Sequence, residues 1–103
     1  MAQLVVTYWR DIPSMVEVKQ GRREKAKRML PDRFQEAIDR AAMRAGASDT
    51  DSYLAQWRKA PPVICGDDLE SEADRISAEI DAAYDDIKLR ELVAASGQAG
   101  PAQ

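Results

Sequence analysis

The fold is decided by residues 4–19, which read LVVTYWRDIPSMVEVK. The first six residues are apolar, aromatic or β-branched on both faces, which is typical of a strand in the middle of a sheet. Residues 15–19 alternate between apolar and charged side chains, which predicts a half-exposed strand with Glu17 on its exposed face. Polar residues and a proline predict a turn over residues 10–14. We therefore expect an antiparallel hairpin whose second strand ends at Gly21.

Two helical patterns follow the hairpin. Pro31 suits the first position of a helix, and Gly46 suits its end. Between them an apolar face repeats every three or four residues, at Phe34, Ile38, Ala41 and Ala45. Ser48 is a good N-cap for a second helix to about Lys59. That helix is expected to bury some combination of Tyr53, Leu54 and Trp57. Residues 22–30 show no clear period and are expected to form a loop or an irregular helical turn.

The last third of the chain predicts a short buried strand at residues 63–65 and a long helix over residues 69–93. An apolar stripe of heptad spacing marks this helix, at Leu69, Ala73, Ile76, Ile80, Ala83 and Ile87. From Leu89 the apolar residues leave the stripe, so the helix is expected to bend or to meet a different surface there. The predicted class is α+β, in which an N-terminal hairpin and a third short strand are packed by three helices in the order β-β-α-α-β-α.

Composition indicates one domain with a charged exterior. The chain has 103 residues, of which 45% are hydrophobic and 32% charged, and these proportions suit a single core. We expect residues 1–95 to form the domain and residues 96–103 to be a disordered tail. The chain shows no secretory signal and no apolar run long enough for a membrane span, and Cys65 is its one cysteine. A cytoplasmic protein that does not bind membranes is therefore expected.

Missing residue types argue against most enzyme chemistry. The chain has no histidine, which removes the commonest general base and the commonest transition-metal ligand. No glycine-rich phosphate loop occurs. We therefore predict no catalytic residue, no metal site and no cofactor. Two weaker candidates have structural alternatives. Cys65 is either a reactive thiol or a buried apolar residue, and Asp67 with Asp68 are either cation ligands or helix caps.

Charge divides the chain into two opposed halves. Residues 1–60 contain 12 Lys and Arg against 8 Asp and Glu, whereas residues 61–103 contain 3 against 10. The basic excess is concentrated in Lys19–Arg28, where Glu24 is the one acid. Such a cluster binds an acidic partner or is neutralised by the protein's own acidic helix. The predicted partner-binding residues are Arg10, Asp11, Lys19, Arg22, Arg23, Lys25 and Arg28.

The turn at Arg10 and Asp11 is included because loops at strand ends often carry binding contacts. The alternative is a local ion pair with no binding role. We expect this turn and the basic cluster to lie at the same end of the sheet. The stripe from Leu69 to Ile87 leaves two readings open, packing on the protein's own sheet or a homodimer seam.

Several stretches resemble the small bacterial "virulence factor" domain, which is similar to a module of conserved virulence factor C type proteins. The resemblance covers about residues 3–93 and is carried by VTYWRDIP at 6–13, FQEAIDRAAM at 34–43 and DSYLAQWR at 51–58. It brings no catalytic motif. It implies an accessory protein, with a folate- or corrinoid-dependent methyl-transfer enzyme of one-carbon metabolism as one candidate partner.

The expected function is therefore a non-catalytic protein-interaction module with an acidic protein as its partner. The alternative is a protein that binds nucleic acid or a phosphorylated ligand through Lys19–Arg28. The acidic pI of about 4.9 and the absence of aromatic residues within the cluster disfavour nucleic acid.

Overall fold

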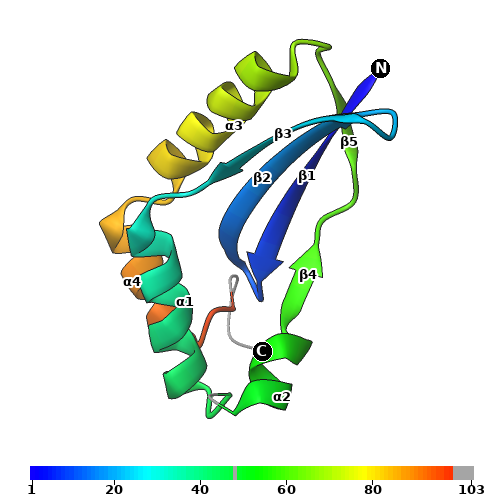
Figure 1. Ribbon diagram of the computed structural model, residues 1–103. Coiled ribbons are helices and arrows are strands. Elements are labelled where there is room, and N and C mark those ends of the chain that lie inside the picture. Colours follow the sequence, from blue (N-terminus) through cyan, green and yellow to red (C-terminus); the bar gives the residue numbers. More distant parts are fainter. Residues whose placement is uncertain (48, 99–103) are drawn as a thin grey trace.

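The computed structural model describes residues 1–47 and 49–98. The described chain forms five strands and four helices in the order β-β-β-α-α-β-β-α-α, so the α+β class is confirmed (Figure 1). The strands are β1 (Ala2–Trp9), β2 (Ile12–Gln20), β3 (Glu24–Met29), β4 (Trp57–Lys59) and β5 (Val63–Cys65). The helices are α1 (Asp32–Arg44), α2 (Thr50–Ala55), α3 (Leu69–Ala83) and α4 (Asp86–Ala94). The observed order has two strands and one helix more than the predicted order.

β1 is the central strand, as its apolar composition predicts. The antiparallel order is β3-β2-β1-β4, and β5 also pairs with β1 beside β4. The turn between β1 and β2 is shorter than expected, because Trp9 already pairs with Ile12. Arg10 adopts a positive φ of 54° to make this two-residue turn. The predicted turn over residues 10–14 is therefore wrong, and Pro13 lies within β2 beside a bulge.

The stretch predicted as a loop at residues 22–30 is instead largely strand β3. It pairs antiparallel with β2 over its whole length, from Met15 opposite Met29 to Gln20 opposite Glu24. The sequence EKAKRM contains no β-branched residue, so its strand character comes from pairing with β2 rather than from propensity. Gly21, with φ of 68°, begins the turn that brings the strand back.

The first helix is confirmed and the second is shorter than predicted. Pro31 is the N-cap of α1, and Gly46 follows its end with φ of 72°. Asp49 caps α2 by accepting from the backbone of Ser52 at 3.2 Å. The predicted cap, Ser48, lies outside the described residues. The helix expected to reach Lys59 ends at Ala55, because the following residues pair with β1 as strand β4.

The third predicted strand is present as β5, but it is not buried. Val63 is 58% exposed and Ile64 is 62% exposed, whereas Cys65 is half-buried. The strand lies at the edge of the sheet, where it pairs with β1 and where Cys65 packs against the α3 cluster. The apolar sequence predicts a buried strand, but a strand at the edge of the sheet leaves Val63 and Ile64 exposed.

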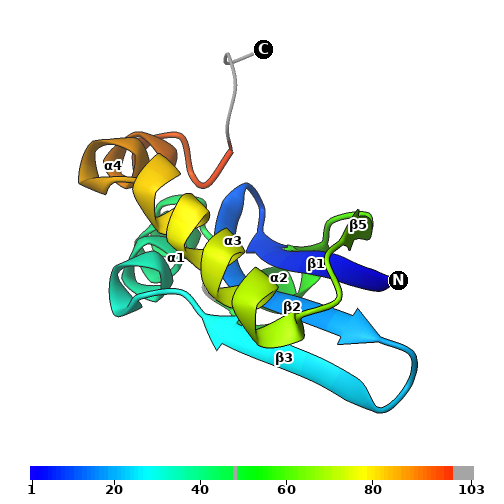
Figure 2. The same ribbon diagram turned by 90° about the horizontal axis from the view of Figure 1, so that it is seen from above.

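Two apolar clusters form the core, and they cover different parts of the sheet. Helix α3 lies across one face over β2 and β3, as both views show (Figures 1 and 2). Its cluster buries Ala2, Val16, Val18, Ala26 and Ala73, with Leu69, Ile76 and Ile80 packed against it. The second cluster lies at the other end of the hairpin, where α1, α2 and α4 surround Trp9 and Ile12. The stripe residues Leu69, Ala73, Ile76 and Ile80 therefore pack on the protein's own sheet, whereas Ala83 is exposed and Ile87 lies in α4 with 62% of its surface exposed.

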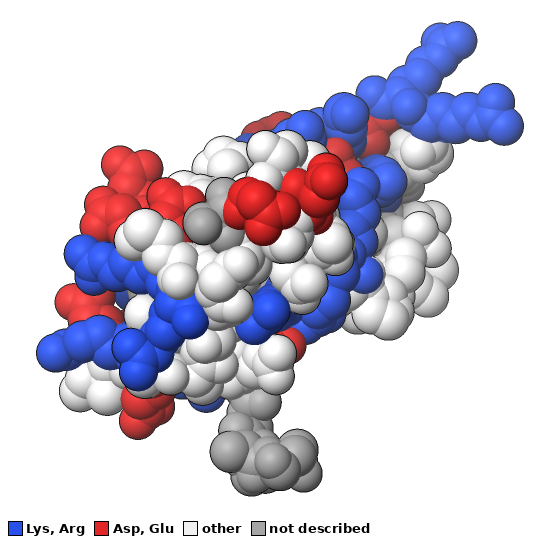
Figure 3. All heavy atoms as spheres, turned by 90° about the horizontal axis from the view of Figure 1, so that it is seen from below, with Lys and Arg blue, Asp and Glu red and all other residues white. Residues whose placement is uncertain are grey.

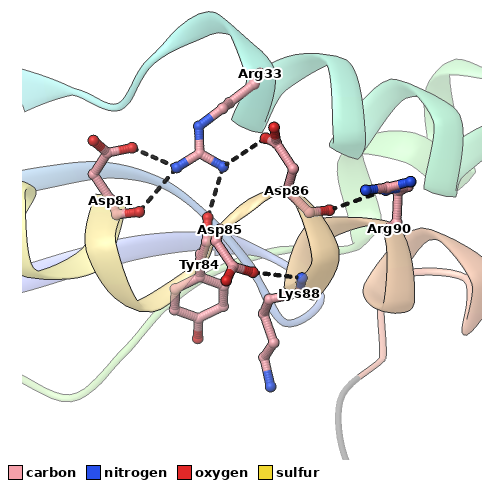
Figure 4. A network of polar contacts seen from close by, with 7 residues as sticks. All are labelled: Arg33, Asp81, Tyr84, Asp85, Asp86, Lys88 and Arg90. Atoms are coloured by element: carbon pink, nitrogen blue, oxygen red, sulfur yellow. Dashed lines mark hydrogen bonds and ion pairs between the residues drawn. The ribbon is translucent and has the colours of Figure 1, made fainter.

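The single helix predicted over residues 69–93 is two helices. α3 ends at Ala83 with Tyr84 as its C-cap, and Asp85 caps α4 by accepting from the backbone of Lys88 at 2.8 Å. Arg33 of α1 holds this break in place, as Figure 4 shows. Its guanidinium donates to the backbone oxygen of Tyr84 at 2.7 Å and to the side chain of Asp81 at 2.5 Å. The break lets α4 turn away from the sheet and pack against α1.

The segment after α4 returns to the β1–β2 turn. Asp11 donates its backbone N–H to the carbonyl of Gly97 at 2.8 Å, and Arg10 Nη1 donates to the carbonyl of Ser96 at 2.9 Å. Residues 96–98 of the predicted tail are therefore attached to the domain. Residues 99–103 lie outside the described residues. Among the described helices, none has the length and apolar character needed to cross a bilayer.

Gly97→Ala is expected to destabilise the protein by about 1–3 kcal/mol. Gly97 has φ of 87°, and an added Cβ would lie 3.0 Å from Cζ3 of Trp9. Gly21→Ala is the matched control, because its φ of 68° carries similar strain while nothing lies within 4 Å. Denaturant unfolding of both variants measures the difference. An equal loss in the two would contradict the close approach to Trp9.

Arg33→Gln is expected to lower the free energy of unfolding by about 1–3 kcal/mol, because charge-assisted bonds to the α3–α4 junction are lost. Arg40→Gln on the same helix is the control, with an expected change below about 0.5 kcal/mol. Within the part of the chain described, Arg40 makes no hydrogen bond or ion pair. Urea unfolding midpoints compare the two variants. If they coincide, Arg33 does not stabilise the junction.

Candidate functional site

The candidate site is the part of the sheet that none of the described helices covers. Side chains alternate across β2 and β3, so the residues facing α3 are followed by residues facing the opposite side. Lys19 lies opposite Lys25, and Glu17 lies opposite Lys27, all on the side away from α3. Figure 3 shows Lys and Arg gathered in a band that begins at two side chains projecting from one end of the molecule. We call this surface the lysine face.

The lysine face encloses a hollow of about 540 Å³. Five cationic side chains contribute to its lining, and two acids lie among them. The lining residues are Glu17, Lys19, Gly21, Arg22, Glu24, Lys25, Lys27 and Lys59. The four lysine side chains are exposed, so their ammonium groups are open to a ligand. Cations around a concave surface concentrate the positive potential there.

Glu17 is the acid at the centre of the lysine face. It was expected on an exposed strand face, but it is only 7% exposed. Its carboxylate lies 3.6 Å from Nζ of Lys19 and 4.0 Å from Nζ of Lys25. The side chains of Lys19 and Lys25 lie against it, and the alternating sequence does not reveal this burial. Glu17 therefore offsets part of the repulsion among the lysines that surround it.

The acidic helix α3 does not cover the lysine face, because it packs on the other side of the sheet. Arg28 faces that other side, where its Nε donates to Asp74 at 2.7 Å and its Nη2 to Glu70. These hydrogen bonds, first to Glu70 and then to Asp74, raise the pKa of the Arg28 guanidinium. Arg28 therefore joins the sheet to α3 and does not lie with the other predicted partner-binding cations.

Arg10 and Asp11 lie at the opposite end of the hairpin from the basic turn. Trp9 pairs with Ile12 at one end of β1, whereas Gln3 pairs with Lys19 near the other. The prediction that the two groups share one end of the sheet is therefore wrong. The Arg10–Asp11 turn and the basic turn are therefore separated by the full length of the paired strands β1 and β2.

The Arg10–Asp11 turn is held by contacts within the protein. Arg10 Nε donates to Oε1 of Gln56 at 3.2 Å, and Arg58 donates to Oδ1 of Asp11 at 2.8 Å. The Arg58 guanidinium also lies 4.6 Å from the centre of the Tyr8 ring. These contacts fix the turn to β4 and α2, so both predicted residues take part in holding the fold together.

Of the predicted partner-binding residues, Lys19, Arg22 and Lys25 line one hollow. Arg23 is an exposed residue of the adjoining turn. Two lining residues were not among the predicted set, Lys27 and Lys59. In a strand, Lys25 and Lys27 lie on the same face because side chains alternate, so recognition of β3 as a strand would have added Lys27 to the predicted set. Lys59 is 40 positions away from Lys19 in the sequence and reaches the site only because β4 pairs with β1.

The weaker candidates take structural roles. Asp68 caps α3 by accepting from the backbone of Ser71 at 3.2 Å, and Asp67 accepts from the backbone of Ala2 at 3.2 Å. Burial, and then the charge of Glu72, raise the pKa of the Cys65 thiol, which disfavours its reactive thiolate. Across residues 1–47 and 49–98, no three potential metal-ligating side chains come together.

Glu17→Gln is expected to lower the free energy of unfolding by about 0.5–1 kcal/mol at low salt, because the lysines lose their central counter-charge. Added salt should reduce this difference, since it screens the remaining repulsion. Glu24→Gln is the matched control, because Glu24 borders the same hollow but is exposed. Chemical unfolding at low and high salt tests the pair. A Glu17→Gln difference that does not depend on salt would contradict the electrostatic role.

Comparison with known proteins gives one finding. Residues 7–93 match the family described as "Virulence factor". This range covers the cluster around Trp9, most of the cluster under α3 and every residue that lines the lysine-face hollow. No curated protein and no solved structure matches this chain. Because the match spans most of the chain, the protein belongs to the virulence factor family.

Proposed function

We propose that this protein is a non-catalytic accessory module that binds an acidic surface of another protein through the lysine face. One observation carries the proposal: the lysines of β2, β3 and β4 share an uncovered hollow, while the protein's own acidic helix lies on the other side of the sheet. The exposed cations therefore have room for external carboxylates. We place this interaction in the cytoplasm, in keeping with a single free cysteine, Cys65.

Exposed apolar residues next to the lysines narrow the kind of partner. Ile64 lies beside Gln3, which pairs with Lys19, so the three form one row across the sheet. Met29, at the end of β3, is 68% exposed. A partner surface that combines Asp and Glu with a few aliphatic side chains would complement both features. A purely ionic ligand would leave Ile64 and Met29 uncovered.

The lysines are expected to act mainly on the rate and register of association. Exposed charges steer a partner into contact, and a reversed charge also weakens the final complex because like charges then face each other. The family resemblance suggests a methyl-transfer enzyme of one-carbon metabolism as the partner. The lysines, together with exposed Ile64 and Met29, support an acidic patch with an apolar margin as the contact surface of that partner.

A nucleic acid or another phosphorylated ligand is the second candidate for the same hollow. Its support is the gathering of five cations, which could contact several phosphates. Proteins that bind single strands also present aromatic rings for base stacking. No aromatic side chain lines this hollow among the described residues. This absence favours the acidic protein.

The test is Lys25→Glu combined with Lys27→Glu. Binding of a labelled peptide that mixes Glu and Leu, and of a labelled single-stranded oligonucleotide, is followed by fluorescence anisotropy at two salt concentrations. We expect the native protein to bind the peptide more tightly than the oligonucleotide. The double variant should lose at least about tenfold in peptide affinity, because the hollow changes from basic to acidic.

Lys88→Glu combined with Arg44→Glu is the matched control. It changes the net charge by the same amount as the test variant, but on helices α4 and α1, away from the lysine face. Circular dichroism melting checks that each variant folds. Equal peptide affinity in the two double variants would overturn the proposal. Tighter binding of the oligonucleotide than of the peptide would favour the second candidate.

A further inference from the structure

A second hollow lies between helices α1 and α4, away from the lysine face. Its volume is about 300 Å³, at the lower end of the range for small-molecule sites. Its floor is apolar and consists of Ala37 from α1 with Leu89 and Val93 from α4. Ala37 and Leu89 are buried, so the floor belongs to the core and is well fixed. The two helices pack around the small Ala37 side chain, which leaves the space above it open.

Arginines from both helices surround this apolar floor. Arg33 closes one end, where its bonds to Tyr84 and Asp81 and its 3.4 Å contact with Asp86 occupy its guanidinium (Figure 4). Arg40, on the next turns of α1, makes no hydrogen bond or ion pair with the described part of the chain. The rim therefore carries an occupied arginine at one end and an unoccupied one farther along.

Arg90 faces the same hollow from α4. Among the described residues, its one hydrogen bond is a long one, in which Nε donates to the backbone oxygen of Asp86 at 3.5 Å. The two terminal nitrogens of its guanidinium are left for another acceptor. Two acids line the rim, Asp86 and Glu36. Asp86 is paired with Arg33, which leaves Glu36 as the acid of the open part. Arg40 and Arg90 together outweigh Glu36, so the open part of the rim is cationic.

We infer that this groove binds a small amphipathic carboxylate, with its apolar body on the floor and its carboxylate between Arg40 and Arg90. Guanidinium groups bind carboxylates through paired hydrogen bonds, which suits the unoccupied nitrogens. The volume corresponds to about ten water molecules, so the ligand is short, on the order of ten to fifteen non-hydrogen atoms. This inference does not depend on the lysine face, because the two surfaces share no residue.

The test uses octanoate as the probe on the full chain. The isotopically labelled protein is titrated with sodium octanoate below its micelle concentration, and backbone amide shifts are followed by NMR. We expect saturable shifts centred on Ala37, Leu89 and Val93. Acetate, which lacks the apolar body, and octanol, which lacks the charge, should not give saturable shifts at these residues.

Two pairs of variants assign the carboxylate contact. Arg40→Gln with Arg90→Gln should weaken octanoate binding by about tenfold or more. Lys25→Gln with Lys27→Gln removes the same number of charges from the lysine face and should leave octanoate binding unchanged. Arg40→Lys with Arg90→Lys retains the charge and should bind with intermediate affinity, which separates a lost contact from a lost fold.

Octanoate shifts that never saturate, or that are equally strong without Arg40 and Arg90, would overturn the inference. Equal binding of octanol would likewise show that the arginines do not select an anion. Either result would leave the proposed role of the lysine face unaffected.

Discussion

The packing of Trp9 is the interaction on which the arrangement of the other elements depends. Its ring is fully buried at the end of β1, where the hairpin turns. Its indole N–H donates to the backbone oxygen of Tyr53 at 2.9 Å, which fixes α2, and Gly97 lies against its ring. Segments separated by more than forty positions meet at this residue. Their meeting keeps α1, α2 and α4 at one end of the sheet and leaves the other end free on the side away from α3.

That distribution of helices explains how the protein keeps its opposite charges apart. The sheet lies between the acidic helix and the lysines, so the two groups do not neutralise each other. Arg28 is the exception, because the alternation of β3 turns it toward Glu70 and Asp74. A shift of one residue in the β2–β3 register would exchange the two sides and bring Lys25 and Lys27 against the acidic helix. Burial of Val18 and Ala26 against Ala73 prevents this shift, because it would expose their apolar surface.

The sequence predicted the helices and strands whose own residues have a clear apolar period or cap. The other elements form because they pair with distant segments of the chain. The first strand, α1 and the class of fold follow from apolar composition, period and caps. The strand at residues 24–29 could not be predicted, because EKAKRM has neither β-branched residues nor an apolar alternation. For the candidate site, the basic cluster identified Lys19, Arg22 and Lys25. The same cluster includes Arg28, which lies on the other face of the sheet, because the face that a residue occupies depends on the pairing of β3 with β2. Lys59 carried no signal, since its place depends on the pairing of β4 with β1.

Glu17 shows how the proposed function and the stability of the sheet oppose each other. A carboxylate at the centre of the lysines reduces their mutual repulsion, but it also competes with the carboxylates of a partner for Lys19 and Lys25. Its distances to these lysines, 3.6 and 4.0 Å, are longer than those of tight ion pairs. The ammonium groups can therefore turn outward without losing a strong bond. An acidic partner would then replace a loose internal contact with a closer one, while the buried Glu17 keeps the empty surface from repelling itself.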